Sequence, residues 1–399
     1  MKILQISPQF PFPLDSGGKI GIYNIVKQLS KFGAEVVFVA FSRYPVKNEH
    51  FEHFKTFCNP FIIYQNTSNN IIKVLKFTIL NKPILTEKYF TKKSKTFFEN
   101  LLNEINFDII HIDHTAMFSV GKWLSIKTGK PLCLRLHNIE WLIWQRYYEE
   151  QAKFSPKKFI LKNQVELLKA KEIEAITYSK ASFTCTEHDK MLALQLVPNA
   201  NILVASPGVD LDFWKIDTSI ERNPYEIVFA TTYNWLPNLD GLKWYLNNVH
   251  KIVVKMEPKA FLTILGKNPP EFCKKYPNVN IVGYVPKVQP YYNRANVFIV
   301  PLFVGSGVRL RILEAMAMGL PVVSTSIGAE GVSATESEGL FISDTPEVFA
   351  ATIVKLIKEQ NFSSELRNNA RRFIEKNYSV GSTIKIIYDE YKRLLGVSS

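Results

Sequence analysis

Short apolar segments alternate with amphipathic segments along the whole chain. Unbroken apolar runs are typical of buried strands, and apolar positions three or four residues apart are typical of helices. In the first half, this pattern predicts strands over residues 3–7, 35–40, 108–112 and 132–136, with a helix over 21–32. Such alternation indicates a parallel sheet with helices on both faces.

The second half repeats the alternation. Predicted strands cover residues 227–230, 260–265, 279–282, 297–300 and 321–324, and amphipathic helices cover 364–377 and 381–395. Pro207 and Gly208 mark a break between the halves. We therefore expect an α/β protein with two doubly wound domains, residues 1–207 and 208–378. The last segment, 379–399, is expected to be a helix that packs back on the first domain.

The composition is that of a soluble globular protein, with 399 residues, 46% hydrophobic and 21% charged. No apolar run approaches the roughly 20 residues that span a bilayer. The first residues lack the apolar region and cleavage site of a signal peptide. The four cysteines are far apart and form no disulfide framework: Cys58, Cys133, Cys185 and Cys273. A cytoplasmic location is the simplest expectation.

The net charge of +13 is concentrated in the first half. Residues 1–207 contain 27 Lys and Arg against 17 Asp and Glu. Between Lys73 and Lys95 the lysines are interleaved with Ile, Leu and Phe, which resembles a surface that docks on anionic lipid. The alternative is an ordinary solvated face. Nucleic acid is not expected as a partner, because no nucleic-acid-binding motif accompanies the charge.

The most informative segment is the glycine loop Gly305-Ser306-Gly307, which precedes a predicted helix and a buried strand. Glycines allow backbone N–H groups to approach a ligand closely, and the positive end of the helix dipole favours phosphate there. Arg309 and Arg311 add guanidinium groups, which suit phosphate oxygens.

Glu314 follows on the first turns of the same predicted helix. A lone carboxylate there can accept hydrogen bonds from sugar hydroxyls. Phosphate donors beside a hydroxyl acceptor predict a site for a nucleoside diphosphate.

Two further strand-to-helix loops carry small or polar residues. Gly17 and Gly18 precede the first predicted helix, as in a phosphate-binding loop, although a tight turn is the simpler reading. Neither a dinucleotide fingerprint nor an ATP-binding loop is present. Thr231 and Asn234 follow the first strand of the second half, where a ligand phosphate could bind.

Histidines follow two strands of the first half. His137 comes directly after the strand over 132–136 and is well placed to contact a ligand, although a structural role is the alternative. His111, Asp113 and His114 could suggest a metal site. Because no further ligand follows at motif spacing, polar residues closing a strand are the favoured interpretation, and we expect no metal.

Together these segments resemble the retaining glycosyltransferases of family four, which have the GT-B fold. The resemblance covers nearly the whole chain and rests on an ordered set of motifs. These are the Pro/Gly loop after the first strand, LRLHNIEW, SPGVDLDFW, YNWLPN, IVGYVPKVQPYYNRANVFIVPL and GSGVRLRILEAMAMGLPVVST.

The resemblance implies two Rossmann-like domains that face a cleft, with an acceptor bound by the first and a nucleotide sugar by the second. It implies that Glu314 binds the ribose hydroxyls and that Tyr284 and Val285 lie beside the base. It further implies that Gly17 and Gly18 approach the donor diphosphate.

The same resemblance assigns His137 to the transferred sugar, as a positioning group. The chain departs from the family pattern at Ser306, where a second glutamate is usual. It also has Thr231 to Asn234 in place of an Arg/Lys pair. Arg309 and Arg311 are therefore expected to neutralise the diphosphate, with Gly307 in the donor loop.

The resemblance predicts a retaining transferase that uses a UDP- or GDP-linked sugar without a cofactor and acts in surface polysaccharide synthesis. The expected acceptor is a glycan or a lipid-linked saccharide, at the inner face of the plasma membrane. Two alternatives stay open: a nucleotide-sugar epimerase, and a non-catalytic binding subunit, which Ser306 favours.

Overall fold

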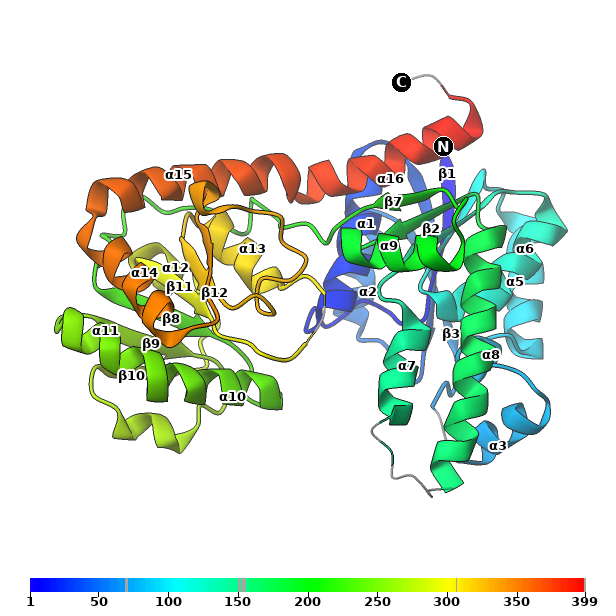
Figure 1. Ribbon diagram of the computed structural model, residues 1–399. Coiled ribbons are helices and arrows are strands. Elements are labelled where there is room, and N and C mark those ends of the chain that lie inside the picture. Colours follow the sequence, from blue (N-terminus) through cyan, green and yellow to red (C-terminus); the bar gives the residue numbers. More distant parts are fainter. Residues whose placement is uncertain (69–70, 150, 152–155, 306, 398–399) are drawn as a thin grey trace. The chain divides into compact units, whose positions relative to one another are not determined.

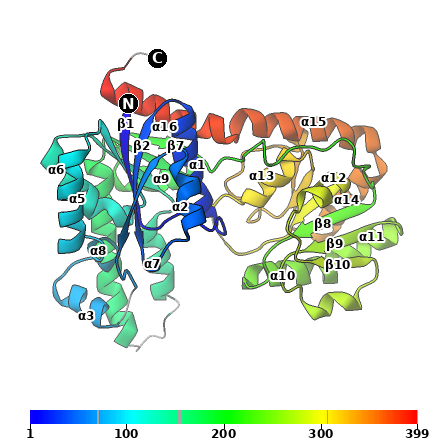
Figure 2. The ribbon, with the colours of Figure 1, turned by 180° about the vertical axis from the view of Figure 1, so that it is seen from behind.

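The computed structural model describes residues 1–68, 71–149, 151, 156–305 and 307–397. The chain forms two compact units (Figure 1). The N-terminal unit comprises residues 1–206 together with 383–399, and the C-terminal unit comprises residues 207–382. Figures 1 and 2 show a twisted sheet within each unit, covered by helices on both faces.

The N-terminal unit contains a seven-stranded parallel sheet in the order β3-β2-β1-β4-β5-β6-β7. Its strands are β1 (Lys2–Ser7), β2 (Glu35–Ser42), β3 (Asn59–Tyr64), β4 (Ile109–Asp113), β5 (Leu132–Leu136), β6 (Ala181–Thr184) and β7 (Ile202–Val204). Because β1 pairs with both β2 and β4, the chain reverses its direction of winding beside β1. The loops that follow β1 and β4 therefore meet at one edge of the sheet.

Helices cover this sheet. They are α1 (Gly17–Lys31), α2 (Asn48–Lys55), α3 (Ile71–Ile79), α4 (Ile84–Glu87), α5 (Lys92–Glu104), α6 (Phe118–Thr128), α7 (Glu140–Glu149), α8 (Pro156–Tyr178), α9 (Glu187–Leu196) and α16 (Val380–Leu395). Local sequence sets several ends. Thr91 and Ser94 form a capping box at the start of α5, and Gly129 ends α6 in the left-handed conformation.

The C-terminal unit contains a six-stranded parallel sheet in the order β10-β9-β8-β11-β12-β13. Its strands are β8 (Glu226–Ala230), β9 (Phe261–Leu265), β10 (Val279–Gly283), β11 (Val297–Val300), β12 (Val322–Ser324) and β13 (Leu340–Ile342). Its α-helices are α10 (Leu236–Trp244), α11 (Lys251–Met256), α12 (Gln289–Arg294), α13 (Leu310–Ala317), α14 (Pro346–Lys358) and α15 (Gln360–Asn377). Here the winding reverses between β8 and β11.

Both sheets are buried on their two faces, which is why their strands read as unbroken apolar runs. In the C-terminal unit, one apolar cluster lies on each face: one includes Met316 of α13, and the other includes Phe349 of α14. Helix α10 approaches the backbone at Pro301 closely because it has a glycine at the point of contact. A Cβ at Gly241 of α10 would lie 2.1 Å from the Pro301 carbonyl oxygen.

The last helix, α16, begins in the C-terminal unit and continues in the N-terminal unit. Tyr391 is fully buried, contacts the ring of Phe183 and hydrogen-bonds through its hydroxyl to His111 Nδ1. Asn201 donates to Glu390 at 2.7 Å. Residues at the two ends of the sequence therefore share one core.

The predicted fold class is confirmed: both sheets are parallel and doubly wound. Strands β3, β6, β7 and β13 were not predicted from the sequence, because they are short or begin with turn-forming residues such as Asn59 and Pro60. Gly17 and Gly18 lie in the first turn of α1 rather than before it. None of the described helices is long and apolar enough to cross a membrane.

We predict that Tyr391→Ala lowers the free energy of unfolding of the N-terminal unit by about 3–5 kcal/mol, the usual cost of deleting a buried aromatic ring. Tyr391→Phe should cost about 1–3 kcal/mol, because it leaves the buried His111 nitrogen without its partner. Urea unfolding followed by circular dichroism measures both. Asp389→Ala, at an exposed position of the same helix, should cost less than about 0.5 kcal/mol. Equal losses in all three variants would contradict the packing of α16.

Candidate active site

The candidate donor site of the C-terminal unit lies where the winding of its sheet reverses. Thr231 directly follows β8, and the segment 301–309 connects the neighbouring strand β11 to α13. In open parallel sheets, ligands bind beyond the carboxyl ends of the strands at such a point. The topology therefore brings the loop after β8 and the start of α13 to one place.

Helix α13 has two chemically different faces. Ile312, Leu313 and Met316 are fully buried in the core. Arg311 and Glu314, three residues apart, lie on the face that is only partly buried. Packing of the apolar face thus fixes the direction in which the cation and the carboxylate project.

The glycine loop before α13 requires its glycines. Gly305 has φ of +141° and Gly307 has φ of +80°, which side-chain-bearing residues rarely adopt. A Cβ at Gly305 would lie 1.9 Å from Arg309 Nη2 and 3.2 Å from the Trp235 ring. Ser306, the predicted donor-site residue between the glycines, lies outside the described residues.

The two arginines are held by the loop after β8. The Arg309 guanidinium lies 5.7 Å from the centre of the Trp235 ring, and Arg311 donates a hydrogen bond to the Thr231 hydroxyl. Burial lowers the pKa of Arg309, helped by the nearby Arg311, but guanidinium groups stay charged at neutral pH. The structure thus brings together two cations, a hydroxyl and a glycine loop. This set is suited to a diphosphate.

Glu314 lies behind these cations on the same helix. Burial raises its pKa to about 7, although the charge of Arg311 opposes the shift. Near neutral pH the carboxyl group can therefore accept hydrogen bonds from hydroxyl groups or, when protonated, donate a hydrogen bond to one. That property fits a diol better than it fits an anion.

The other predicted donor-site residues are more dispersed. Asn234 is exposed, in a loop that is fixed by the hydrogen bond from Asn238 to the Thr232 carbonyl at 2.7 Å. Tyr284 and Val285 follow β10, which β9 separates from β8. Tyr284 is 70% exposed, and Val285 packs against the core. The exposed ring and the backbone beside it are free to meet a flat ligand.

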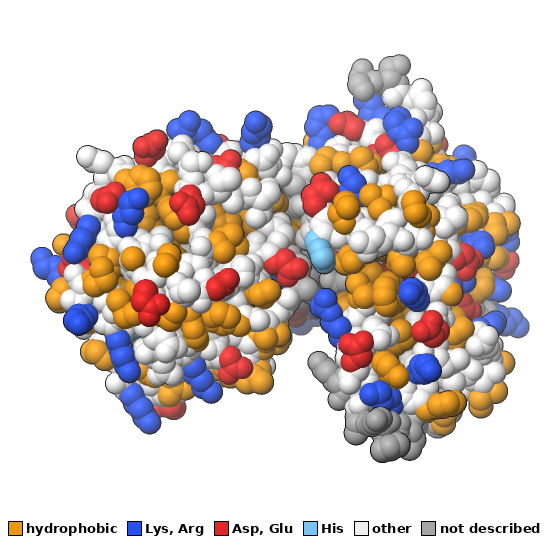
Figure 3. Space-filling model, in the orientation of Figure 1, with side chains coloured by type: hydrophobic (Ala, Val, Ile, Leu, Met, Phe, Trp, Pro, Cys, Tyr) orange, Lys and Arg blue, Asp and Glu red, His pale blue; other side chains and the backbone are white. Residues whose placement is uncertain are grey.

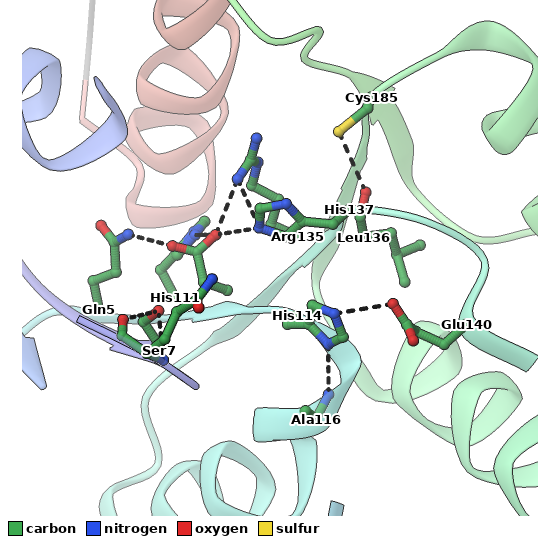
Figure 4. A network of polar contacts seen from close by, with 12 residues as sticks. Gln5, Ser7, His111, His114, Ala116, Arg135, Leu136, His137, Glu140 and Cys185 are labelled. Atoms are coloured by element: carbon green, nitrogen blue, oxygen red, sulfur yellow. Dashed lines mark hydrogen bonds and ion pairs between the residues drawn. The ribbon is translucent and has the colours of Figure 1, made fainter. Parts of the chain in front are cut away.

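In the N-terminal unit, His137 belongs to a network of buried polar groups at the ends of β4 and β5 (Figure 4). Arg135 Nη1 lies 2.8 Å from His137 Nε2 and 3.2 Å from Asp113 Oδ1. The Gln5 amide donates to Asp113 Oδ2 at 2.6 Å. Hydrogen bonds from its neighbours and the charge of Arg135 hold the pKa of Asp113 well below its usual range, against the effect of burial.

His114 follows β4 in an unusual backbone conformation, with φ of +97°. Its Nε2 lies 2.9 Å from Glu140 Oε1, and its ring faces that of His137 at 5.7 Å between centres. The Glu140 carboxylate raises the pKa of His114 in spite of its burial. Glu172 accepts hydrogen bonds from the backbone N–H groups of Glu140 and Trp141 and so caps α7.

The metal alternative for His111, Asp113 and His114 is not supported by these contacts. His111 points to Tyr391, Asp113 to Arg135, and His114 to Glu140. Among the described residues, no group of three His, Cys, Asp or Glu side chains is arranged to hold a metal ion.

Gly17 and Gly18 begin α1 after the extended residue Ser16. A Cβ at Gly18 would meet Gln9 Nε2 only at 3.8 Å, an ordinary contact. Steric crowding within the unit therefore does not explain this glycine.

Sequence reasoning missed Arg135 and Glu140 as parts of these sites, and it assigned Trp235 only to fixing the loop or the start of the following helix, where Trp235 is indeed the N-cap of α10. Arg135 is predicted as an ordinary strand residue by the apolar pattern, yet it is almost fully buried. The signal was available, since a charged residue inside a run typical of a fully buried strand needs a buried partner. His111 and Asp113, in the neighbouring strand, supplied the same signal.

Two family models match the chain. The model described as Glycosyltransferase Family 4 matches residues 16–213, which include His137. The model described as Glycosyl transferases group 1 matches residues 224–359, which include Arg311 and Glu314. An uncharacterized 44.6 kDa protein in the cps region of Klebsiella pneumoniae is 25% identical over 410 residues, covering 98% of this chain and 99% of that protein.

Solved structures of GT-B glycosyltransferases share the fold. Sucrose-phosphate synthase from Thermosynechococcus elongatus matches over 100% of both chains with a TM-score of 0.68 and 14% identity. A glycosyltransferase from Rickettsia africae matches over 100% of this chain and 99% of that one, with a TM-score of 0.63 and 16% identity. HepE from Anabaena, solved in complex with UDP, matches over 98% and 100%, with a TM-score of 0.62 and 14% identity. The GT-B prediction is thereby confirmed.

We predict that Glu314→Gln changes the free energy of unfolding more favourably at pH 8 than at pH 5. The difference between the two changes should be on the order of 2 kcal/mol. The folded-state pKa of about 7 exceeds the ordinary value of 4.5. Between those values, the unfolded chain has lost the proton and the folded chain keeps it, so stability falls as pH rises towards 7. Glutamine cannot ionise and removes this loss.

Denaturant unfolding of both proteins at pH 5 and pH 8 tests the prediction. Glu365→Gln, at an exposed position of α15, is the matched control and should show no such pH dependence. If Glu314→Gln behaves like this control, the carboxyl group is not held in the environment described above.

Proposed function

Because the chain belongs to the group 1, family 4 glycosyltransferases, we propose that it is a retaining enzyme that uses a nucleoside diphosphate sugar. The observation that carries the proposal is the cation pair at the start of α13. The Arg309 guanidinium lies over the Trp235 ring and Arg311 donates a hydrogen bond to the Thr231 hydroxyl, so both positive charges are fixed where phosphate groups of a donor would bind.

The donor is proposed to be UDP- or GDP-linked. Glu314 would bind the ribose hydroxyls, and Tyr284 with the Val285 backbone would lie against the base. HepE was solved with UDP, which supports a uridine nucleotide as the first candidate. Gly305, Gly307 and the loop residue Ser306 would lie beside the diphosphate, with Asn234 as a further polar contact.

In the N-terminal unit, Gly17 and Gly18 are assigned to the diphosphate and His137 to the transferred sugar. In the proposed reaction, the bond between the anomeric carbon and the diphosphate oxygen breaks. The acceptor hydroxyl oxygen forms a new bond on the same face of the sugar, and its proton passes to the leaving phosphate. Arg309 and Arg311 stabilise the negative charge that develops on the diphosphate.

The acceptor is proposed to be a glycan or a lipid-linked saccharide of a surface polysaccharide. The relative from the cps region of Klebsiella pneumoniae, which matches over almost the full length of both chains, supports this assignment. The proposed location is the cytoplasm, at the inner face of the membrane that carries such acceptors.

A second observation supports membrane docking. Ile79 and Leu80, at the end of α3, and Phe159 of α8 are exposed, and Lys76 and Lys82 are exposed beside them in sequence. Helices α3 and α8 are in contact, since the Gln164 amide of α8 donates a hydrogen bond to the Thr78 hydroxyl of α3 at 3.2 Å. Figure 3 shows hydrophobic and basic side chains next to each other over this part of the unit. Apolar and basic groups side by side suit an anionic bilayer surface.

We expect slow release of nucleoside diphosphate from one donor in a panel of UDP- and GDP-sugars. Arg311→Ala should reduce kcat/KM about 10²–10³-fold, because one group that stabilises the developing charge is lost. Arg372→Ala, at an exposed position of α15, should leave turnover unchanged. Nuclear magnetic resonance of the product identifies the anomer and hence retention. An altered donor sugar would indicate the epimerase, and absence of both binding and turnover would indicate the non-catalytic subunit.

Co-sedimentation with vesicles should show binding to phosphatidylglycerol and little binding to phosphatidylcholine at low salt. The double variant Lys76→Glu/Lys82→Glu should weaken binding, at about 1 kcal/mol per lost lysine and more for the reversal. Lys251→Glu/Lys259→Glu, at exposed positions of the C-terminal unit, should bind like the parent protein. Equal binding to both vesicle types, or none, would rule out the docking surface.

A further inference from the structure

The contact between Arg135 and His137 fixes the position of a proton. Arg135 Nη1 lies 2.8 Å from His137 Nε2. Because an arginine N–H group can only donate, Nε2 must supply the lone pair. A neutral imidazole has one protonated nitrogen, so the proton lies on Nδ1.

Asp113 holds the arginine rather than the histidine. Its Oδ1 lies 3.2 Å from both Arg135 Nη1 and His137 Nε2. A carboxylate only accepts, and Nε2 already accepts from the arginine, so no proton lies between Asp113 and His137. The guanidinium is therefore the shared donor, and the carboxylate compensates its buried charge.

The packing of α1 leaves room for this guanidinium. Gly21 faces Arg135, and a Cβ at Gly21 would lie 2.9 Å from Nη2 and 3.2 Å from Nη1. Any side chain at this position would displace the arginine. A glycine at position 21 therefore allows the observed orientation of Arg135. The helical conformation of α1 does not by itself require a glycine there.

We propose that Arg135 is a positioning residue that fixes His137 as the neutral imidazole with its proton on Nδ1. The inference rests on the proposed function, in which His137 contacts the transferred sugar. It adds that His137 donates a hydrogen bond to a sugar oxygen and does not act as a base. A donor whose proton cannot move keeps the same role across the working pH range.

The surrounding charges agree with this assignment. Burial and the charge of Arg135 lower the pKa of His137 to about 4, while Asp113 opposes the shift. The titratable groups near the pair come from every neighbouring element. They are His111 and Asp113 of β4, His114 after it, Glu140 of α7, Glu172 of α8, Cys185 and Asp189 beyond β6, and Tyr391 of α16.

The decisive measurement is the protonation state of His137 in the full-length wild-type protein. Long-range proton–nitrogen correlation spectra of protein labelled with ¹⁵N-histidine distinguish Nδ1–H from Nε2–H, and His137→Gln assigns the resonance. We expect Nδ1–H, and no titration between pH 8 and about pH 5. A proton on Nε2, or titration near the ordinary histidine pKa, would overturn the proposal.

Two variants test the role of Arg135. Arg135→Gln leaves the Asp113 carboxylate facing His137, so the histidine pKa should rise by about one to three units. Protonation of Nε2 leaves the Nδ1–H donor in place, so this shift is read in the histidine spectrum, while kcat/KM of the parent should stay level between pH 8 and about pH 5. Gly21→Ala keeps both charges and should produce a smaller shift of the same sign by displacing the guanidinium. Arg146→Gln, at an exposed position of α7, is the control and should leave the histidine pKa unchanged.

The spectrum and the turnover assay separate the two hypotheses. If His137 has the expected tautomer but no donor is turned over, the proposed function fails and the assignment of the proton stands. If turnover is normal and the His137 pKa measured in Arg135→Gln equals that of the parent, the proposal for Arg135 fails and the transferase function stands.

Discussion

The N-terminal unit depends on the compensation of one buried negative charge, the Asp113 carboxylate. A carboxylate removed from water is strongly destabilising unless it is paired and fully hydrogen-bonded. Gln5 and Arg135 supply that compensation from the two strands that flank β4. The arginine in turn requires the space beside Gly21 and contacts His137. One buried charge therefore determines residues in β1, β5 and α1, and orients the histidine that follows β5.

The buried carboxyl group of the C-terminal unit, Glu314, has a pKa shift opposite to that of Asp113. Glu314 is close enough to Arg311 to be influenced by it, yet burial still raises its pKa to about 7. Asp113, with direct hydrogen-bond donors, has a pKa well below the usual range. Arg311 instead donates to Thr231, a neutral hydroxyl. Its charge is therefore not neutralised by a direct carboxylate partner in this contact, and a phosphate group can interact with it more strongly.

The apolar pattern was sufficient to predict the parallel sheets, because strands buried on both faces need little besides Val, Ile, Leu and Phe. It did not predict β13 or β7, each of three residues, because these short apolar runs were not separated from loops, although β12, which is equally short, was predicted. The sequence predicted Thr231 and the two arginines as parts of one donor site. The hydrogen bond from Arg311 to Thr231 and the cation–π contact of Arg309 with Trp235 depend on side-chain conformations that no spacing encodes. Arg135 was missed because its partner, Asp113, is 22 residues away in sequence and adjacent only across the sheet.

Two neighbouring imidazoles show why the surroundings, rather than the residue type, determine the chemistry of a site. The rings of His114 and His137 are 5.7 Å apart, but His114 faces the Glu140 carboxylate and His137 faces the Arg135 guanidinium. The pKa of His114 is raised, and that of His137 is lowered to about 4. The electrostatic influence of His114 also contributes to the lowered pKa of His137. His114 holds its place with a φ of +97°, a backbone conformation costing on the order of 1–3 kcal/mol. This conformation accompanies the contact between His114 and Glu140, so two neighbouring rings at the ends of β4 and β5 have pKa shifts of opposite sign.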